Sequence, residues 1–143
     1  MTAKDASNNT IPYFSALFDN ITLSANSPLT GTITGLGCAA KNVLNKGTDF
    51  VNGVADLTAL GMTFNGVAGT GTFMATSADN KTGSSGNVTF VPGSFHYFLL
   101  RLSTFQTNSV PFIGVNTLTA KDVDGNAVTD FDESLDNVAI TRS

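Results

Sequence analysis

Short segments in which apolar and polar residues alternate, separated by turn-forming residues, recur along almost the whole chain. Residues 21–24, 29–35 and 88–91 show this alternation, and Asn, Asp, Gly or Pro lie at their ends. Because side chains of a β-strand point to opposite faces in turn, this period predicts half-buried strands. Turn signals about 8–12 residues apart are typical of β-sandwiches and related folds. We therefore predict an all-β protein, a single β-sandwich or jelly roll with at most one short helix.

Residues 38–52 are the best candidate for that helix. Ala40, Val43 and Leu44 have the i, i+3, i+4 spacing of one helical face. Gly47 interrupts the pattern, and glycine disfavours the interior of a helix. The segment predicts one short helix or a single helical turn.

Residues 95–105 form the strongest predicted strand. Its apolar side chains fall on both faces, with Phe95, Tyr97 and Leu99 on one face and Phe98, Leu100 and Leu102 on the other. A strand that is apolar on both faces belongs in the centre of a covered sheet or at a subunit contact. A closing strand is predicted over residues 135–141, which match residues 18–24 in residue type.

The length of 143 residues fits one domain. Residues 1–12 begin with a polar stretch and are predicted to be a flexible or subunit-bridging N-terminal arm. Residues 13–143 are predicted to be the β-sandwich domain.

The charge of the chain argues against two classes of partner. Charged residues make up 13% of the sequence, well below the roughly 25% typical of soluble domains, and the net charge is −4. A nucleic-acid surface requires clustered Lys and Arg, so we expect no nucleic-acid partner. No apolar run approaches the ~18 residues of a membrane span, so we expect no membrane segment.

The residues that usually carry catalysis are scarce. His96 is the sole histidine, Cys38 is the sole cysteine, and the nucleophile motif G-x-S-x-G does not occur. We therefore expect a protein that is not an enzyme and that has no organic cofactor.

One acidic segment has the spacing of a calcium loop. Its candidate ligands stand at loop positions 1, 3, 5, 9 and 12, and are Asp122, Asp124, Asn126, Asp130 and Glu133. Position 6 of such loops is glycine, whereas Ala127 stands here. The same residues also predict a plain hairpin turn around Asp-Gly-Asn. Both interpretations remain open, and Ca²⁺ is the one cofactor that the sequence suggests.

Two resemblances bear on function. The chain as a whole, acidic and rich in Gly, Thr and Asn, resembles in character the small structural proteins of phage virions, such as capsid decoration or cement proteins. Phage tail-tube subunits are a related possibility. Residues 131–141, with the sequence FDESLDNVAIT, are similar to the closing strand of secreted jelly-roll modules that bind carbohydrate.

The first resemblance implies a non-enzymatic virion protein that stabilises a shell by bridging its neighbours. Its partners would be further copies of itself, the major capsid protein, or both. The alternatives are a secreted carbohydrate-binding or adhesive module and a tail-tube subunit. The apolar segments and low charge also predict a homo-oligomer, most simply a trimer, in which residues 1–18 reach a neighbour.

Overall fold

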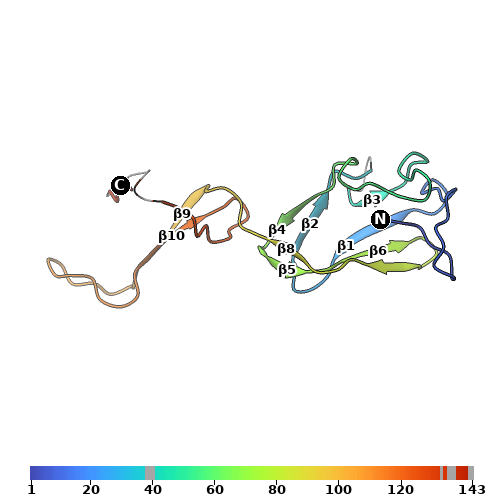
Figure 1. The fold of residues 1–143 in the computed structure, drawn as a ribbon. Helices are drawn as coiled ribbons and strands as arrows, with labels where there is room; N and C mark the ends of the chain where they lie inside the picture. Colours follow the sequence, from blue (N-terminus) through green and yellow to red (C-terminus); the bar gives the residue numbers. More distant parts are fainter. Residues whose placement is uncertain (38–40, 133, 135–137, 142–143) are drawn as a thin grey trace. The chain divides into compact units, whose positions relative to one another are not determined.

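The computed structural model of the protein describes residues 1–37, 41–132, 134 and 138–141. These residues form ten β-strands and no helix (Figure 1). The strands are β1 (Ile21–Ala25), β2 (Gly31–Thr34), β3 (Val43–Leu44), β4 (Thr63–Gly66), β5 (Gly69–Gly71), β6 (Phe73–Ser77), β7 (Thr82–Ser84), β8 (Val88–Phe90), β9 (Tyr97–Arg101) and β10 (Thr117–Lys121). The predicted all-β class is confirmed.

The strands pair into four small sheets, and every pairing is antiparallel. One sheet has four strands in the order β3-β1-β6-β7. The other three have two strands each: β2 with β4, β5 with β8, and β9 with β10. These sheets establish the all-β class but not a single β-sandwich or jelly roll.

The chain divides into two compact units, Met1–Phe90 and Val91–Ser143, named unit 1 and unit 2 below. Unit 1 contains β1 to β8, and unit 2 contains β9 and β10.

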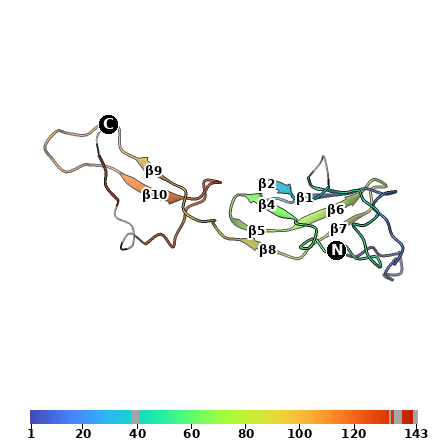
Figure 2. The same cartoon turned by 90° about the horizontal axis from the view of Figure 1, so that it is seen from above.

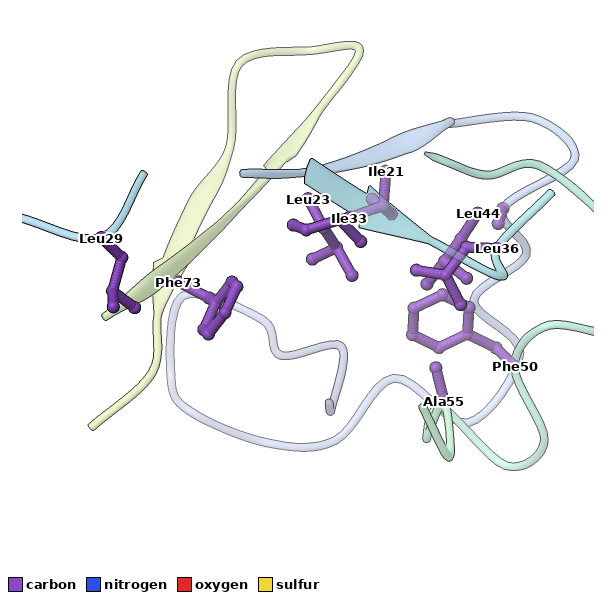
Figure 3. Packing of buried hydrophobic residues seen from close by; sticks show 10 residues of the cluster. Ile21, Leu23, Leu29, Ile33, Leu36, Leu44, Phe50, Ala55 and Phe73 are labelled. Atoms are coloured by element: carbon purple, nitrogen blue, oxygen red, sulfur yellow. The ribbon is translucent and has the colours of Figure 1, made fainter. Parts of the chain in front are cut away.

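Unit 1 is organised around an apolar core. Its members are Ala16, Ile21, Leu23, Leu29, Ile33, Leu36, Leu44, Phe50, Ala55 and Phe73. Figure 3 shows Leu36, Leu44 and Phe50 gathered together, with Ala55 beside the ring. Leu36 and Leu44 are each only 1% exposed. Burying one such side chain contributes about 1.5–3 kcal/mol, so this core can stabilise unit 1 from within.

The core follows directly from the alternation of β1. Ile21 and Leu23 are buried, while Thr22 between them is exposed. The rings of Phe64, Phe73 and Phe90 contact one another with centroids 4.6 to 5.9 Å apart. These rings tie β4, β6 and β8 together.

Residues 1–11, within the segment predicted as an arm, lie against residues 51–55 of the same chain. The N-terminal ammonium of Met1 donates to the carbonyl of Ala55 at 2.8 Å, and the Ala3 amide donates to Gly53 at 2.8 Å. The Ile11 amide donates back to Ala3 at 3.0 Å. Gly53 has φ +77°, and a Cβ there would overlap the carbonyl of Ile11. This close approach requires glycine.

The helix predicted within residues 38–52 is not formed in the described part, residues 41–52. Asn42 bonds to β1 instead, through its side-chain amide to the Leu23 carbonyl at 2.9 Å. The Asp49 carboxylate accepts from the amides of Asn45 and Lys46, both at 2.8 Å. Side chains of Asn and Asp that bond locally compete with the helix for backbone groups. The helical prediction is therefore wrong over residues 41–52.

The strand predicted over residues 95–105 is shorter, and among the described residues it does not lie in the centre of a sheet, which was one of its two predicted positions. The other position, a subunit contact, stays a prediction. β9 lies in a two-stranded sheet beside β10, with Leu99 opposite Thr119 (Figure 1, Figure 2). The apolar pattern indicates that both faces of this strand can be buried, but the sequence does not identify the residues or the partner that would bury them.

The closing strand was predicted over residues 135–141. Residues 138–141 form no strand, and residues 135–137 lie outside the described residues.

Candidate functional site

Unit 2 differs from an ordinary domain because its described residues bury no apolar side chain. Every buried hydrophobic residue that the structure describes belongs to unit 1. The one described residue of unit 2 in the buried class is polar, Asp122, at 2% exposure. A two-stranded ribbon without a hydrophobic core is at best marginally stable in water. Unit 2 therefore presents apolar surface that needs a cover.

Much of this surface belongs to the long connection between β9 and β10, residues 102–116, named the apolar loop (Figure 1). Its exposed apolar side chains are Leu102, Phe105, Val110, Phe112, Ile113 and Val115. Phe105 is 86% exposed and Phe112 is 58% exposed. No charged residue occurs from Leu102 to Ala120. An exposed apolar surface of this kind marks a contact site more often than a free surface.

The side chain of Gln106 fixes the shape of the apolar loop. Its carboxamide nitrogen donates to the carbonyls of Ser103 and Ile113 at 3.2 and 3.0 Å. Its carboxamide oxygen accepts from the Ile113 amide at 2.9 Å. One side chain thus joins the two limbs of the loop.

Asn116 and Ser103 close the base of the apolar loop. The Asn116 carboxamide oxygen accepts from the Ser103 amide at 3.0 Å, and its nitrogen donates to Ile113 at 3.1 Å. The Ser103 hydroxyl donates to the Val115 carbonyl at 3.2 Å. Polar groups therefore bond inside the loop while the apolar side chains remain outside. Such preorganisation lowers the entropic cost of binding a partner.

Three aromatic rings cluster beside the hairpin. Phe98 of β9 lies 4.7 Å from Phe95 and 5.3 Å from Phe131, and Phe95 lies 5.1 Å from Phe131, measured between centroids. Phe95 still leaves 40% of its surface exposed. The cluster orders unit 2 locally but does not bury it.

Asp122, the first residue of the predicted calcium loop, closes a tight turn. Its carboxylate accepts from the Asn126 amide at 2.7 Å, from the Asn126 side chain at 2.9 Å, and from the Gly93 amide at 2.8 Å. These hydrogen bonds, first among them the one from the Asn126 side chain, lower the pKa of Asp122 against the opposing effect of burial. The predicted hairpin turn is thereby present, with the Asp122 amide bonded to the Asn126 carbonyl at 3.0 Å.

Of the other predicted calcium ligands, the structure brings Asn126 against Asp122. Asp124 and Asp130 are exposed, Asn126 spends its side chain on Asp122, and Glu133 lies outside the described residues. Among the residues that the structure describes, no three or more His, Cys, Asp or Glu side chains group to hold a metal ion. Calcium binding at these five residues stays a prediction.

A hollow of about 390 Å³ lies between β1 and β2 in unit 1. It is lined by Leu23, Ser24, Ala25, Gly31, Thr32, Ile33 and Asn42. None of these side chains titrates near neutral pH, so the lining offers no general acid or base. His96, the sole histidine, is exposed in unit 2 with its ring 6.1 Å from that of Tyr97.

In comparisons with known proteins, no family model, no curated protein and no solved structure matches the chain. In the described part of the chain, no helix is long and apolar enough to cross a membrane.

The sequence predicts part of the apolar surface of unit 2 but not the hydrogen bonds that hold the apolar loop in shape. The two-faced apolar pattern of residues 95–102 and the need to cover Phe105 and Phe112 are visible in the sequence. The bracing by Gln106 and Asn116 is not, because single polar residues in a loop have no periodicity. The one available signal is the uncharged run from Leu102 to Ala120.

Proposed function

We propose that this protein is a non-enzymatic structural subunit of a virion, most simply a capsid decoration or cement protein, that docks through the apolar loop of unit 2. The absence of any buried apolar side chain among the described residues of unit 2 carries the proposal. Such a unit gains its stability by packing on another surface, which is how a cement protein bridges neighbours. A single β-sandwich or jelly roll over residues 13–143 remains the proposed architecture.

The exposed rings of the apolar loop set the scale of the docking energy. Phe105 and Phe112 together expose on the order of 300 Å² of apolar surface. Burying it would contribute about 7 kcal/mol, against a cost of roughly 4–15 kcal/mol for association. These two rings alone do not hold a complex, so the proposal requires that neighbouring apolar residues of the loop are covered as well.

The uncharged character of the apolar loop supports a protein partner with a similarly apolar contact surface. Association through this loop should depend little on ionic strength, because no charge is neutralised there. A subunit of a shell meets such surfaces on its neighbours, and low charge removes the repulsion between them.

The test compares two equally exposed phenylalanines, one in each unit. Phe105 of unit 2 is 86% exposed and Phe18 of unit 1 is 88% exposed. Phe105→Ser should weaken self-association, or binding to particles that lack the protein, about thirtyfold or more, as expected for a central interface anchor. Phe18→Ser should weaken both much less. An equal loss in the two variants would instead place the contact in residues 1–18, the segment predicted to reach a neighbour. Sedimentation and particle co-pelleting measure the two variants. Equal binding by both variants and the unmodified chain would reject the apolar loop as the docking element.

A secreted carbohydrate-binding or adhesive module is the alternative. Tyr13 and Phe18 in unit 1 are 86% and 88% exposed, and exposed aromatic rings can stack on sugars. Glycan-array binding that Tyr13→Ala abolishes and Phe105→Ser leaves intact would favour this alternative. Binding to particles without any glycan binding would favour the structural subunit.

A further inference from the structure

The outer edge of β9 is open. β9 pairs with β10 over residues Tyr97–Arg101, and the described residues provide no second strand on its other side. The outer edge of β10 is partly covered, since the Val128 amide donates to the Ala120 carbonyl at 2.9 Å and Lys121 bridges to Ala127. An open strand edge presents unpaired amides and carbonyls that can bond to another strand. Of the two strands, β9 is the one available for pairing along its whole length.

β9 also lacks the features that normally block an edge. In the four-stranded sheet of unit 1 the edge strands are short: β3 has 2 residues and β7 has 3, all exposed in β7. β9 has 5 residues, of which the first four are Tyr97-Phe98-Leu99-Leu100, and its one charged residue is Arg101 at the end. Proteins usually protect edges with charges, proline, bulges or short strands. An open edge of five residues, of which the first four are aromatic or aliphatic, is a site for adding a strand.

We infer that β9 pairs antiparallel with β9 of a second copy of this chain, around a twofold axis at Leu99. This inference rests on the proposed assembly function, and it identifies a second copy of the chain as a partner of unit 2. It joins two ribbons into one four-stranded sheet, in the order β10-β9-β9-β10. A twofold axis makes the contact self-complementary, so that each copy contributes the same residues.

The residues of β9 favour this register. With the axis at Leu99, Tyr97 of one copy stands opposite Arg101 of the other, and Phe98 stands opposite Leu100. Arginine beside a tyrosine ring makes a favourable cation–π contact, and the two Arg101 side chains lie at opposite ends of the contact. The register therefore pairs all five residues, places Leu99 against Leu99 of the other copy, and avoids opposing like charges. A partner without β9 would lack this match.

Cysteine cross-linking tests the inference on the full chain. In a Cys38→Ser background, which removes the sole native cysteine, Leu99→Cys places one thiol at the proposed axis. Opposed residues of an antiparallel pair have Cα atoms about 4.5–5.5 Å apart, within the range that a disulfide requires. We expect mild oxidation to convert the variant to a covalent dimer.

The matched control is Thr119→Cys in the same background. Thr119 is the partner of Leu99 across β9 and β10, and both residues are half-buried. It should stay monomeric on denaturing gels, because β10 is on the far side of each ribbon from the proposed axis. A thermal melt matching that of the background chain shows that each variant folds.

The outcomes separate this inference from the proposed function. Efficient cross-linking through Leu99→Cys, with little through Thr119→Cys, supports pairing at β9. Equal cross-linking of both variants overturns the pairing. The pairing is also overturned if a chain that still assembles through Phe105 shows no cross-linking at Phe98→Cys, Leu99→Cys or Leu100→Cys. Either result leaves the docking proposal standing. A chain that neither self-associates nor binds particles defeats both.

Discussion

The two units of this protein have similar contents of apolar residues but differ in whether those residues are buried. Six of the eleven phenylalanines lie in unit 1 and five lie in the shorter unit 2. In unit 1, β1 has a strand on each side, and its buried face meets side chains from other elements. In unit 2 the described strands form one two-stranded ribbon, and no apolar side chain that the structure describes is buried. The number of partner elements, and not the apolar content, decides whether a segment stabilises itself.

The comparison assigns different tasks to apolar residues of the same type. Under the proposed function, those of unit 1 set the free energy of unfolding, and those of unit 2 set the free energy of association. Each prediction below changes one side of this division.

The largest effect on folding should come from the core of unit 1. Leu44→Ala removes a side chain that is 1% exposed and should cost about 2–5 kcal/mol of unfolding free energy, through lost burial and a residual cavity. Leu118→Ala in unit 2, at 40% exposure, should cost less than about 1 kcal/mol. Urea unfolding of both variants measures the difference. Equal losses would contradict the assignment of stability to unit 1.

A smaller effect should follow from loosening the apolar loop. Gln106→Ala removes the hydrogen bonds to Ser103 and Ile113 and should weaken association by about 1–2 kcal/mol, five- to thirtyfold, without lowering the stability of unit 1. Amide exchange at Ile113 should accelerate in the free chain. Thr104→Ala, at an exposed position of the same loop, is the control and should change neither quantity.

Acid should loosen the turn at Asp122, and this effect should be confined to low pH. Its pKa is lowered below the ordinary value of 3.8 in the folded chain, chiefly by the Asn126 side chain. The stabilisation is therefore fully present above pH ~4 and is lost as the pH falls through the folded pKa. The protection of the Asn126 amide, measured as its exchange rate relative to that of an unstructured amide at the same pH, should fall on this acidification. Asp122→Asn should remove the pH dependence at the turn, whereas Asp124→Asn, at an exposed position, should retain it.

Calcium should have the smallest effect. Both oxygens of Asp122 already accept hydrogen bonds within the turn, and Asp124 and Asp130 are exposed. We expect millimolar Ca²⁺ to leave the melting temperature unchanged. A rise that Asp124→Ala abolishes would show instead that the five predicted ligands rearrange into a site, since a ligand that binds the folded state stabilises it.

The sequence predicts the strands whose alternation is local, and β1 is the clearest case. Ile21 and Leu23 are buried as the period requires. It does not predict the outcome at Asn42 and Asp49, where local side-chain bonds replaced the expected helix. For β9, the sequence shows that both faces are apolar, but it does not identify the element or the partner chain that packs against them. Likewise Gln106 acts through partners seven and ten residues away, a relation without periodicity.

Hydrogen exchange of the full chain, followed across protein concentration alongside sedimentation velocity, tests the central claim most directly. We predict that amides of β9 and of residues 102–116 become protected as the sedimenting mass increases, while the core of unit 1 is protected equally at every concentration. A chain that remains monomeric, with the protection of residues 97–116 independent of concentration, would contradict the account.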